Sequence, residues 1–160
     1  QELYDWLDAE PQLFHPGDLD YIHSVERIGR LSNVISINGG VQLDLMGQEN
    51  AESAGTRQLS GIGGQMDFLE GAFRSKGGKG FICINSSRVT KDGERKSNIV
   101  AAIPGGSTVS APRTMIDCVA TEYGVVRLAG KSLRERAEAM ASIAHPDFRE
   151  ELMKYAREHF

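Results

Sequence analysis

The sequence predicts a single α/β domain, built on a mixed and mostly parallel sheet with flanking helices. Short apolar runs typical of strands alternate with amphipathic stretches of helical period along the 160 residues. The chain then closes with two consecutive helical patterns. A tight hairpin turn is expected at Gly39-Gly40, so the sheet should not be purely parallel. The chain is long enough to bury one sizeable core, and we treat residues 1–160 as one domain.

The first thirty residues read as helical. Leu3, Trp6 and Leu7 share one side of a short opening helix, which Pro11 and Pro16 should end. A second helix is expected over residues 20–31. Its apolar side would carry four residues: Ile22, Val25, Ile28 and Leu31.

Six segments read as strands. Residues 33–38 are expected to pair with residues 41–45 across Gly39-Gly40, the second strand being half exposed because its apolar residues alternate. The continuous apolar run at 81–84 predicts a buried strand. The polar stretch 86–97 reads as an exposed loop. The remaining predicted strands cover residues 98–103, 117–121 and 124–128.

Three helices complete the predicted order. Residues 66–74 form an amphipathic pattern with Met66, Leu69 and Phe73 on one side. Ser132 and Glu135 have the spacing of a capping box, which predicts a helix start there. Pro146 suits the first turn of the last helix. We expect these last two helices to serve packing alone.

Composition excludes several classes of function. The net charge of −4 and the lack of a basic run give no sign of nucleic-acid or anionic-membrane binding. Apolar stretches are too short to span a bilayer, and the acidic start does not resemble a signal peptide. Cys83 and Cys118 are expected to be buried free thiols in a reducing cytoplasm, and no metal site is expected. Because the chain begins at Gln1, we expect a fragment of a longer protein.

The strongest local signal is the glycine-rich stretch 60–65, which directly precedes the predicted helix 66–74. Glycines 61, 63 and 64 leave the backbone open to close approach by a ligand. A helix that starts after such a loop directs unpaired N–H groups and a positive dipole end toward that ligand. The pattern indicates an anion or oxyanion site, although such loops often only connect elements.

Other candidate residues each carry two interpretations. Glu122 lies between two strands and would be a base or nucleophile, or would bond to backbone at a turn. Lys76 would meet a phosphate or end a helix. His23 would be an acid or base, or simply packed. Asn38 and Gln65 would orient a carbonyl group or cap local turns.

Six ordered motifs resemble the acetyl-CoA hydrolase/transferase family, which contains 4-hydroxybutyrate and butyryl-CoA:acetate CoA-transferases. They follow the 33–48 region, whose pattern is also similar. The motifs are Ser53-Ala-Gly-Thr56, Ser60-Gly-Ile-Gly-Gly-Gln-Met-Asp-Phe68, Ser75-Lys-Gly-Gly78, Thr121-Glu-Tyr-Gly124, Gly130-Lys-Ser-Leu-Arg-Glu-Arg136 and Ala144-His-Pro-Asp-Phe-Arg149. The resemblance covers essentially the whole chain and implies a CoA-transferase-like (NagB/RpiA-like) domain, the C-terminal part of a two-domain enzyme.

The resemblance also implies site residues. Gly61, Gly63, Gly64 and Gln65 would line the CoA thioester, with the Gly64 N–H as an oxyanion donor, and Lys76 would lie near CoA. Asn38 and Glu122 would lie beside the site, and His23 would line it in place of the family's asparagine. Gln42 stands where many members carry glutamate. The family's nucleophilic glutamate would lie upstream, so no catalytic residue is expected in this chain.

The function implied by the resemblance is transfer of CoA between a short-chain acyl-CoA and a carboxylate, through a glutamyl-CoA thioester. Acyl-CoA hydrolysis is the alternative within the family, and a non-catalytic nucleotide- or phosphate-binding module is the alternative from another class. CoA would be a substrate, with no tightly bound cofactor. The expected partners are the enzyme's own N-terminal domain and a second copy in a homodimer, with no nucleic acid and no membrane.

Overall fold

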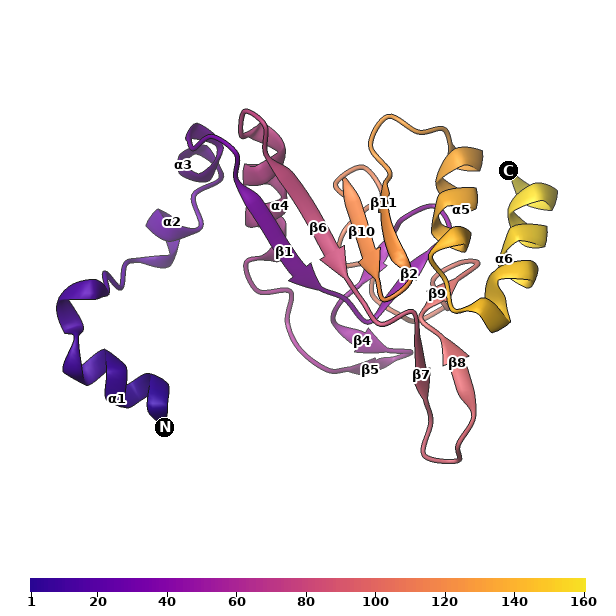
Figure 1. Cartoon of the computed structure of the whole chain (residues 1–160), viewed down its shortest axis with the longest axis horizontal. Helices are drawn as coiled ribbons and strands as arrows, with labels where there is room; N and C mark the ends of the chain where they lie inside the picture. Colours follow the sequence, from indigo (N-terminus) through magenta and orange to yellow (C-terminus); the bar gives the residue numbers. More distant parts are fainter.

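The computed structural model describes residues 1–160, beginning with a helical arm that projects away from the rest of the molecule (Figure 1). The predicted opening helix is confirmed as α1, but the predicted helix 20–31 is wrong as a single element. It divides because the hydroxyl of Ser24 accepts a hydrogen bond from the Arg27 N–H and starts a new helix. Of its four expected apolar residues only Ile28 is buried. The elements are α1 (Glu2–Ala9), η1 (Pro11–Leu13), α2 (Leu19–Ile22) and α3 (Val25–Arg30).

The central sheet confirms the predicted fold class. Its order is β1-β6-β10-β11, with β1, β6 and β10 parallel and β11 antiparallel to β10. The strands are β1 (Ile35–Gly39), β6 (Lys79–Cys83), β10 (Cys118–Thr121) and β11 (Gly124–Arg127). Helix α4 (Gln65–Arg74) lies in the connection from β1 to β6, as parallel strands require.

The predicted hairpin at Gly39-Gly40 is wrong. After β1 the chain leaves the central sheet, and β2 (Gln42–Asp44) pairs with β3 (Glu49–Asn50) and with β9 (Ile99–Val100) in a second sheet. All three β2 residues are buried, because neighbours cover both sides of the strand. The buried carboxylate of Asp44 has hydrogen bonds to both oxygens. It accepts from the Gln48 backbone N–H at 2.8 Å and from the Gln48 side-chain amide at 2.7 Å. The antiparallel pair that makes the central sheet mixed is β10 with β11, not a hairpin at Gly39-Gly40.

Two further hairpins extend from the domain. The segment 86–97, predicted as a loop, forms β7 (Ser87–Val89) and β8 (Arg95–Ser97), which Figure 1 shows as an extended finger. The other pairs β4 (Ser53–Ala54) with β5 (Arg57–Gln58). Both are short two-stranded ribbons, a type that has little stability without packing against other elements.

The C-terminal helices follow the sequence prediction. α5 (Leu133–Ser142) starts with the predicted capping box, and α6 (Pro146–His159) starts with Pro146 in its first turn. In α4 the predicted apolar side is partly wrong, because Leu69 is buried while the side chain of Phe73 is 72% exposed. No helix is both long and apolar enough to cross a bilayer.

One face of the central sheet carries the core and the other is open. Ile82 of β6 and Val119 of β10 pack with Leu69 of α4 and Met140 of α5 in a single cluster. The strand residues that alternate with them face the other side, where Ile37 is 68% exposed and Val125 is 62% exposed. Sheets of parallel strands are normally covered on both faces. This open face, carrying Ile35, Ile37 and Val125, is therefore an unusual apolar surface.

Candidate functional site

The carboxyl ends of β1, β6 and β10 meet at one edge of the central sheet, and their arrowheads point the same way in Figure 1. In open α/β sheets this edge is where ligands bind, because loops from neighbouring strands converge there. A cavity of about 370 Å³ lies at this edge. It is lined by residues that follow or end the three strands: Gly40, Cys83, Ile84, Asn85, Ala120 and Thr121.

Glu122 joins two of these strand ends. Its carboxylate accepts a hydrogen bond from the Ser86 backbone N–H at 2.8 Å and another from the Ser86 hydroxyl at 2.7 Å. Partial desolvation raises the pKa of Glu122, but the Ser86 hydrogen bonds outweigh it and leave the pKa below its ordinary value. The carboxylate is thus ionised and accepts a backbone hydrogen bond, which agrees with the prediction that Glu122 bonds to backbone. The donor is not in the same turn, however, but in the segment that follows β6.

The glycine-rich loop reaches the same edge. Helix α4 runs back along the strands, so its first turn lies at their carboxyl ends and its last turn at their starts. Gly63 adopts a φ of +60° with open space around it, and no side chain caps the helix at Gly64. Gly61 is likewise open to solvent. The first turn of α4 therefore offers backbone donors to a ligand.

His23 lies directly against this turn. A side chain at position 64 would collide with its imidazole ring. Its Nδ1 lies 3.5 Å from a carboxylate oxygen of Asp67, and its ring meets that of Phe68 edge-on at 5.1 Å. The structure thus brings His23 and Gly64, which the sequence analysis treated separately, into contact.

Glu49 is a residue that the sequence analysis missed. It is fully buried at the start of β3, and its Oε2 accepts a hydrogen bond from the side-chain amide of Gln65. Its Oε1 has no partner and faces Gly40. Burial raises the pKa of Glu49 to about 7, and the bond from Gln65 offsets only part of that effect. No periodicity or spacing marks such a residue, because its partner lies sixteen positions away.

Two other predicted site residues, Asn38 and Lys76, do not line the cavity at the strand ends. Asn38 lies one residue before the end of β1, and its amide donates to the Ser36 hydroxyl at 2.8 Å. Lys76 lies beyond the last turn of α4, where its carbonyl accepts a hydrogen bond from the Asn33 N–H just before β1. Since α4 has ten residues, its length of about 15 Å separates Lys76 from Gly64. The structure does not bring the lysine and the glycine loop together.

The two cysteines differ. Cys118 is buried, as predicted, and burial raises its pKa to about 11. Cys83 is exposed, so the prediction that both thiols are buried is wrong for it. Cys83 is the last residue of β6 and lines the cavity at the strand ends, whereas Cys118 lies on the same face but between β6 and β11. No cluster of three or more potential metal ligands is present.

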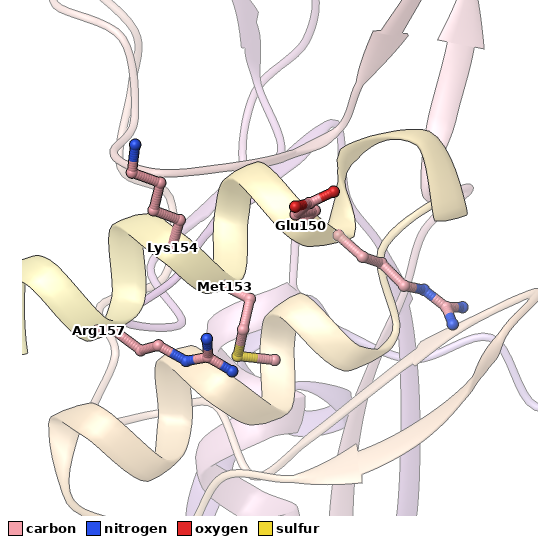
Figure 2. Close-up of a pocket in the computed structure, with 5 residues that line it drawn as sticks. Glu150, Met153, Lys154 and Arg157 are labelled. Atoms are coloured by element: carbon pink, nitrogen blue, oxygen red, sulfur yellow. The ribbon is translucent and has the colours of Figure 1, made fainter.

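A second cavity, of about 560 Å³, lies along α6 (Figure 2). It is lined by five residues of that helix alone: Arg149, Glu150, Met153, Lys154 and Arg157. Figure 2 shows Lys154 pointing away from Met153 and Arg157. The charged groups that line this cavity therefore do not converge on one point. A binding site needs polar groups that converge from several directions. The cavity at the strand ends is therefore the better candidate.

Comparison with known proteins identifies relatives over nearly the whole chain. Residues 1–156 match the family described as acetyl-CoA hydrolase/transferase C-terminal domain. The chain is 42% identical to a butyryl-CoA:acetate CoA-transferase of Anaerostipes caccae, over 98% of this chain and 35% of that protein. It is 44% identical to a 4-hydroxybutyrate coenzyme A transferase of Clostridium kluyveri, over 100% of this chain and 36% of the relative. An acetyl-CoA hydrolase of Kluyveromyces lactis is 34% identical over 81% of the chain and 24% of its own length.

A solved structure shares the fold. RipA from Yersinia pestis superposes with a TM-score of 0.77 at 40% identity, over 88% of this chain and 31% of that one. The chain thus spans about a third of the length of the relatives that it matches.

Proposed function

The chain belongs to the acetyl-CoA hydrolase/transferase family, and on that premise we propose that it is the C-terminal domain of a CoA-transferase. The enzyme would move CoA between a short-chain acyl-CoA and a carboxylate. The observation that carries the proposal is that the first turn of α4 lies at the same sheet edge as the cavity, linked to the cavity residue Gly40 through Glu49 and Gln65. Backbone donors there would stabilise the oxyanions of acyl transfer.

The reaction would proceed by covalent catalysis from a glutamate upstream of this chain. Its carboxylate attacks the thioester carbonyl, and collapse of the tetrahedral oxyanion expels CoA thiolate and leaves an acyl-glutamyl anhydride. The thiolate then attacks the glutamyl carbonyl, which releases the first carboxylate and leaves a glutamyl-CoA thioester. The acceptor carboxylate takes CoA by the same steps in reverse.

Within this scheme the N–H groups of Gly64 and Gln65 face the thioester oxygen, and Gly61 and Gly63 let the acyl-CoA approach the backbone closely. Each tetrahedral step places new negative charge on that oxygen, so donors fixed in advance act most strongly there. His23 lines the same turn from outside. Its imidazole occupies the space into which a side chain at position 64 would extend.

Two further residues act at a distance from the thioester. Glu122, ionised and bonded to Ser86, holds the ends of β6 and β10 together at the cavity, while Asn38 lies at the end of β1. Lys76 lies at the other end of α4, so its partner would be a remote part of the long CoA molecule rather than the thioester. A phosphate group is the chemistry that suits a lysine there.

The partners of this domain would be the enzyme's N-terminal domain and a second copy in a homodimer. Supporting this, the open face of the central sheet exposes Ile35, Ile37 and Val125, which a parallel sheet normally buries. The arm that precedes α3 likewise exposes large apolar side chains, among them Trp6 and Tyr21. These surfaces suit further parts of a larger enzyme.

The test uses the full-length enzyme and this chain side by side. We expect transfer of CoA from butyryl-CoA to acetate by the full-length enzyme and none by the 160-residue chain. Changing the upstream glutamate to alanine should abolish transfer while acyl-CoA still binds. Transfer at the wild-type rate by that variant would overturn the covalent mechanism.

Hydrolysis is the second candidate, favoured by the acetyl-CoA hydrolases among the relatives. It differs only in whether water or a carboxylate intercepts the glutamyl thioester. Release of free CoA without acetate would support hydrolysis, whereas formation of acetyl-CoA from added acetate with no net release of free CoA would support transfer. Calorimetric titration with CoA and with ATP tests the non-catalytic alternative, which requires binding of ATP at least as tight as binding of CoA.

A further inference from the structure

Two carboxylates of this chain are fully buried, and only one of them is left incompletely bonded. Asp44 satisfies both oxygens through Gln48. Glu49 satisfies Oε2 through the amide of Gln65, but Oε1 has no hydrogen-bond partner. A buried, unpaired carboxylate oxygen is costly, so its retention calls for a physical reason.

The unpaired oxygen lies just behind the cavity at the strand ends. A Cβ on Gly40 would lie 2.6 Å from Glu49 Oε1 and 3.1 Å from Ile84 Cγ2. Gly40 and Ile84 both line that cavity. Glu49 thus connects the cavity wall, through Gly40, with Gln65 in the first turn of α4.

No charged group faces this carboxyl from the elements packed around it. Its neighbours include Leu43 of β2, the Gln65 amide of α4, Gly40, Ile84 and the backbone of the segment 110–111, and no charged group contributes to its pKa shift. The nearest carboxylates along the chain are bonded elsewhere, Asp44 to Gln48 and Glu52 to the Ser110 hydroxyl at 2.6 Å. Burial therefore acts on Glu49 unopposed by any cation and favours the neutral acid.

We propose that Glu49 is a positioning residue that acts in its protonated form, holding Gln65 and the first turn of α4 against the strand ends. The neutral carboxylic acid can remain buried with Gln65 as its hydrogen-bond donor. The ionised carboxylate has only that one donor, so it requires water at Oε1. Hydration of Oε1 requires Gln65 to shift away from Glu49, and that movement displaces the backbone donor of the adjacent Gly64. The inference rests on the proposed function only for the statement that these donors face substrate.

The first test measures positioning without any assay of activity. In this chain, backbone and side-chain amide NMR signals of residues 61–67 are followed from pH 5 to pH 9. We expect the signals of Gly64 and of the Gln65 side chain to move together with a midpoint near 7. In Glu49→Gln, which mimics the protonated acid, that movement should vanish. In the matched control Glu70→Gln, a half-exposed position on the same helix, it should persist.

His23 must be controlled for, because it is a second titratable side chain in contact with Gly64. Its neighbour Asp67 also faces the turn. The same series is therefore run with His23→Gln present throughout. A titration of the Gly64 signal that survives Glu49→Gln in that background, or one that is absent from the His23→Gln chain itself, would overturn the proposal. If Glu49→Gln does not fold, the carboxyl ¹³C signal of Glu49 is titrated in the unaltered chain instead. A midpoint that differs from that of the Gly64 signal would overturn the proposal.

The second test asks whether this positioning reaches the chemistry. In the full-length enzyme, kcat/KM for acyl-CoA should fall several-fold above pH 7, and Glu49→Gln should remove that fall while keeping activity at pH 6. An unchanged fall would contradict the link to catalysis. Because the NMR series needs no catalysis, failure of the proposed function and failure of this inference would be distinguished.

Discussion

The Glu122 carboxylate accepts two hydrogen bonds from Ser86, one from its backbone N–H and one from its hydroxyl. The pair fastens the segment after β10 to the segment after β6, at the edge where the candidate cavity lies. A glutamate that sequence reasoning could treat as nucleophile or as turn residue is thus already engaged in a structural contact.

Loss of this contact should weaken the fold modestly. Because Glu122 is solvent-exposed, we expect Glu122→Ala to lower the free energy of unfolding at pH 7 by about 1 kcal/mol, the usual scale of a hydrogen bond to a charged group after screening. The folded-state pKa of Glu122 is depressed, so its contribution is present above pH 4.5 and is lost as the pH falls through the folded pKa. Urea unfolding from pH 3 to pH 7 should show a smaller acid-induced loss in the variant. Glu150→Gln, an exposed change on α6, serves as control.

Glu49 should have the opposite pH signature. Its folded-state pKa is raised from 4.5 to about 7, so its contribution to stability is fully present below pH 4.5 and is lost as the pH rises to about 7. Glu49→Gln should therefore be more stable than the unaltered chain at pH 8, by up to about 3 kcal/mol, and equally stable at pH 4. Denaturant midpoints at both pH values measure the difference. Equal effects at the two pH values would show that Glu49 is not protonated in the folded state.

Arg136 is a buried cation that serves the backbone. Its guanidinium donates to the carbonyls of Met46 at 2.7 Å, Leu128 at 3.0 Å and Arg113 at 2.6 Å, tying three separate segments to α5. Arg136→Met keeps the length of the side chain but leaves these carbonyls without donors. We expect it to lower the unfolding free energy by roughly 3 kcal/mol, against a few tenths for the exposed control Arg134→Met. Thermal unfolding followed by circular dichroism would check both.

His23 and Gly64 should be coupled in a double-mutant cycle. The backbone of Gly64, at φ −88° and ψ 11°, suits any residue, so only the imidazole of His23 opposes a side chain there. Gly64→Ala alone should destabilise the chain by about 1–2 kcal/mol, and the same change in a His23→Ala background should cost little. Additive effects in urea unfolding would mean that the two residues do not touch in solution.

The strand pairing shows where sequence reasoning stops. The alternation in residues 41–45 correctly marks a strand, and Gly39-Gly40 correctly marks the end of the strand before it. The partners of β2 are nevertheless β3 and β9, the latter more than fifty residues later, and neither is β1. Local pattern carries no information about such a partner, because burial on both sides of β2 arises only when distant segments pack against it.

The candidate site divides in the same way. The glycine loop and the helix after it were readable from residue types, since glycine permits the φ of +60° at position 63 and a helix start leaves donors unpaired. Lys76 could not be placed from sequence. It lies only a dozen residues from Gly64, yet the rigid length of α4 holds the two at opposite ends of the helix.

By itself the sequence determined the α/β class, the family, the capped start of α5 and the glycine turn before α4, because each depends on residue types at short spacing. Only the tertiary structure decided which of these groups meet. It placed His23 on Gly64, bonded Glu122 to Ser86 and buried Glu49 behind Gly40 with one oxygen unpaired. The physical reason is that burial and hydrogen-bond satisfaction are properties of packed segments, so the residue with the most altered acidity of any carboxyl group here carried no signal in the chain alone.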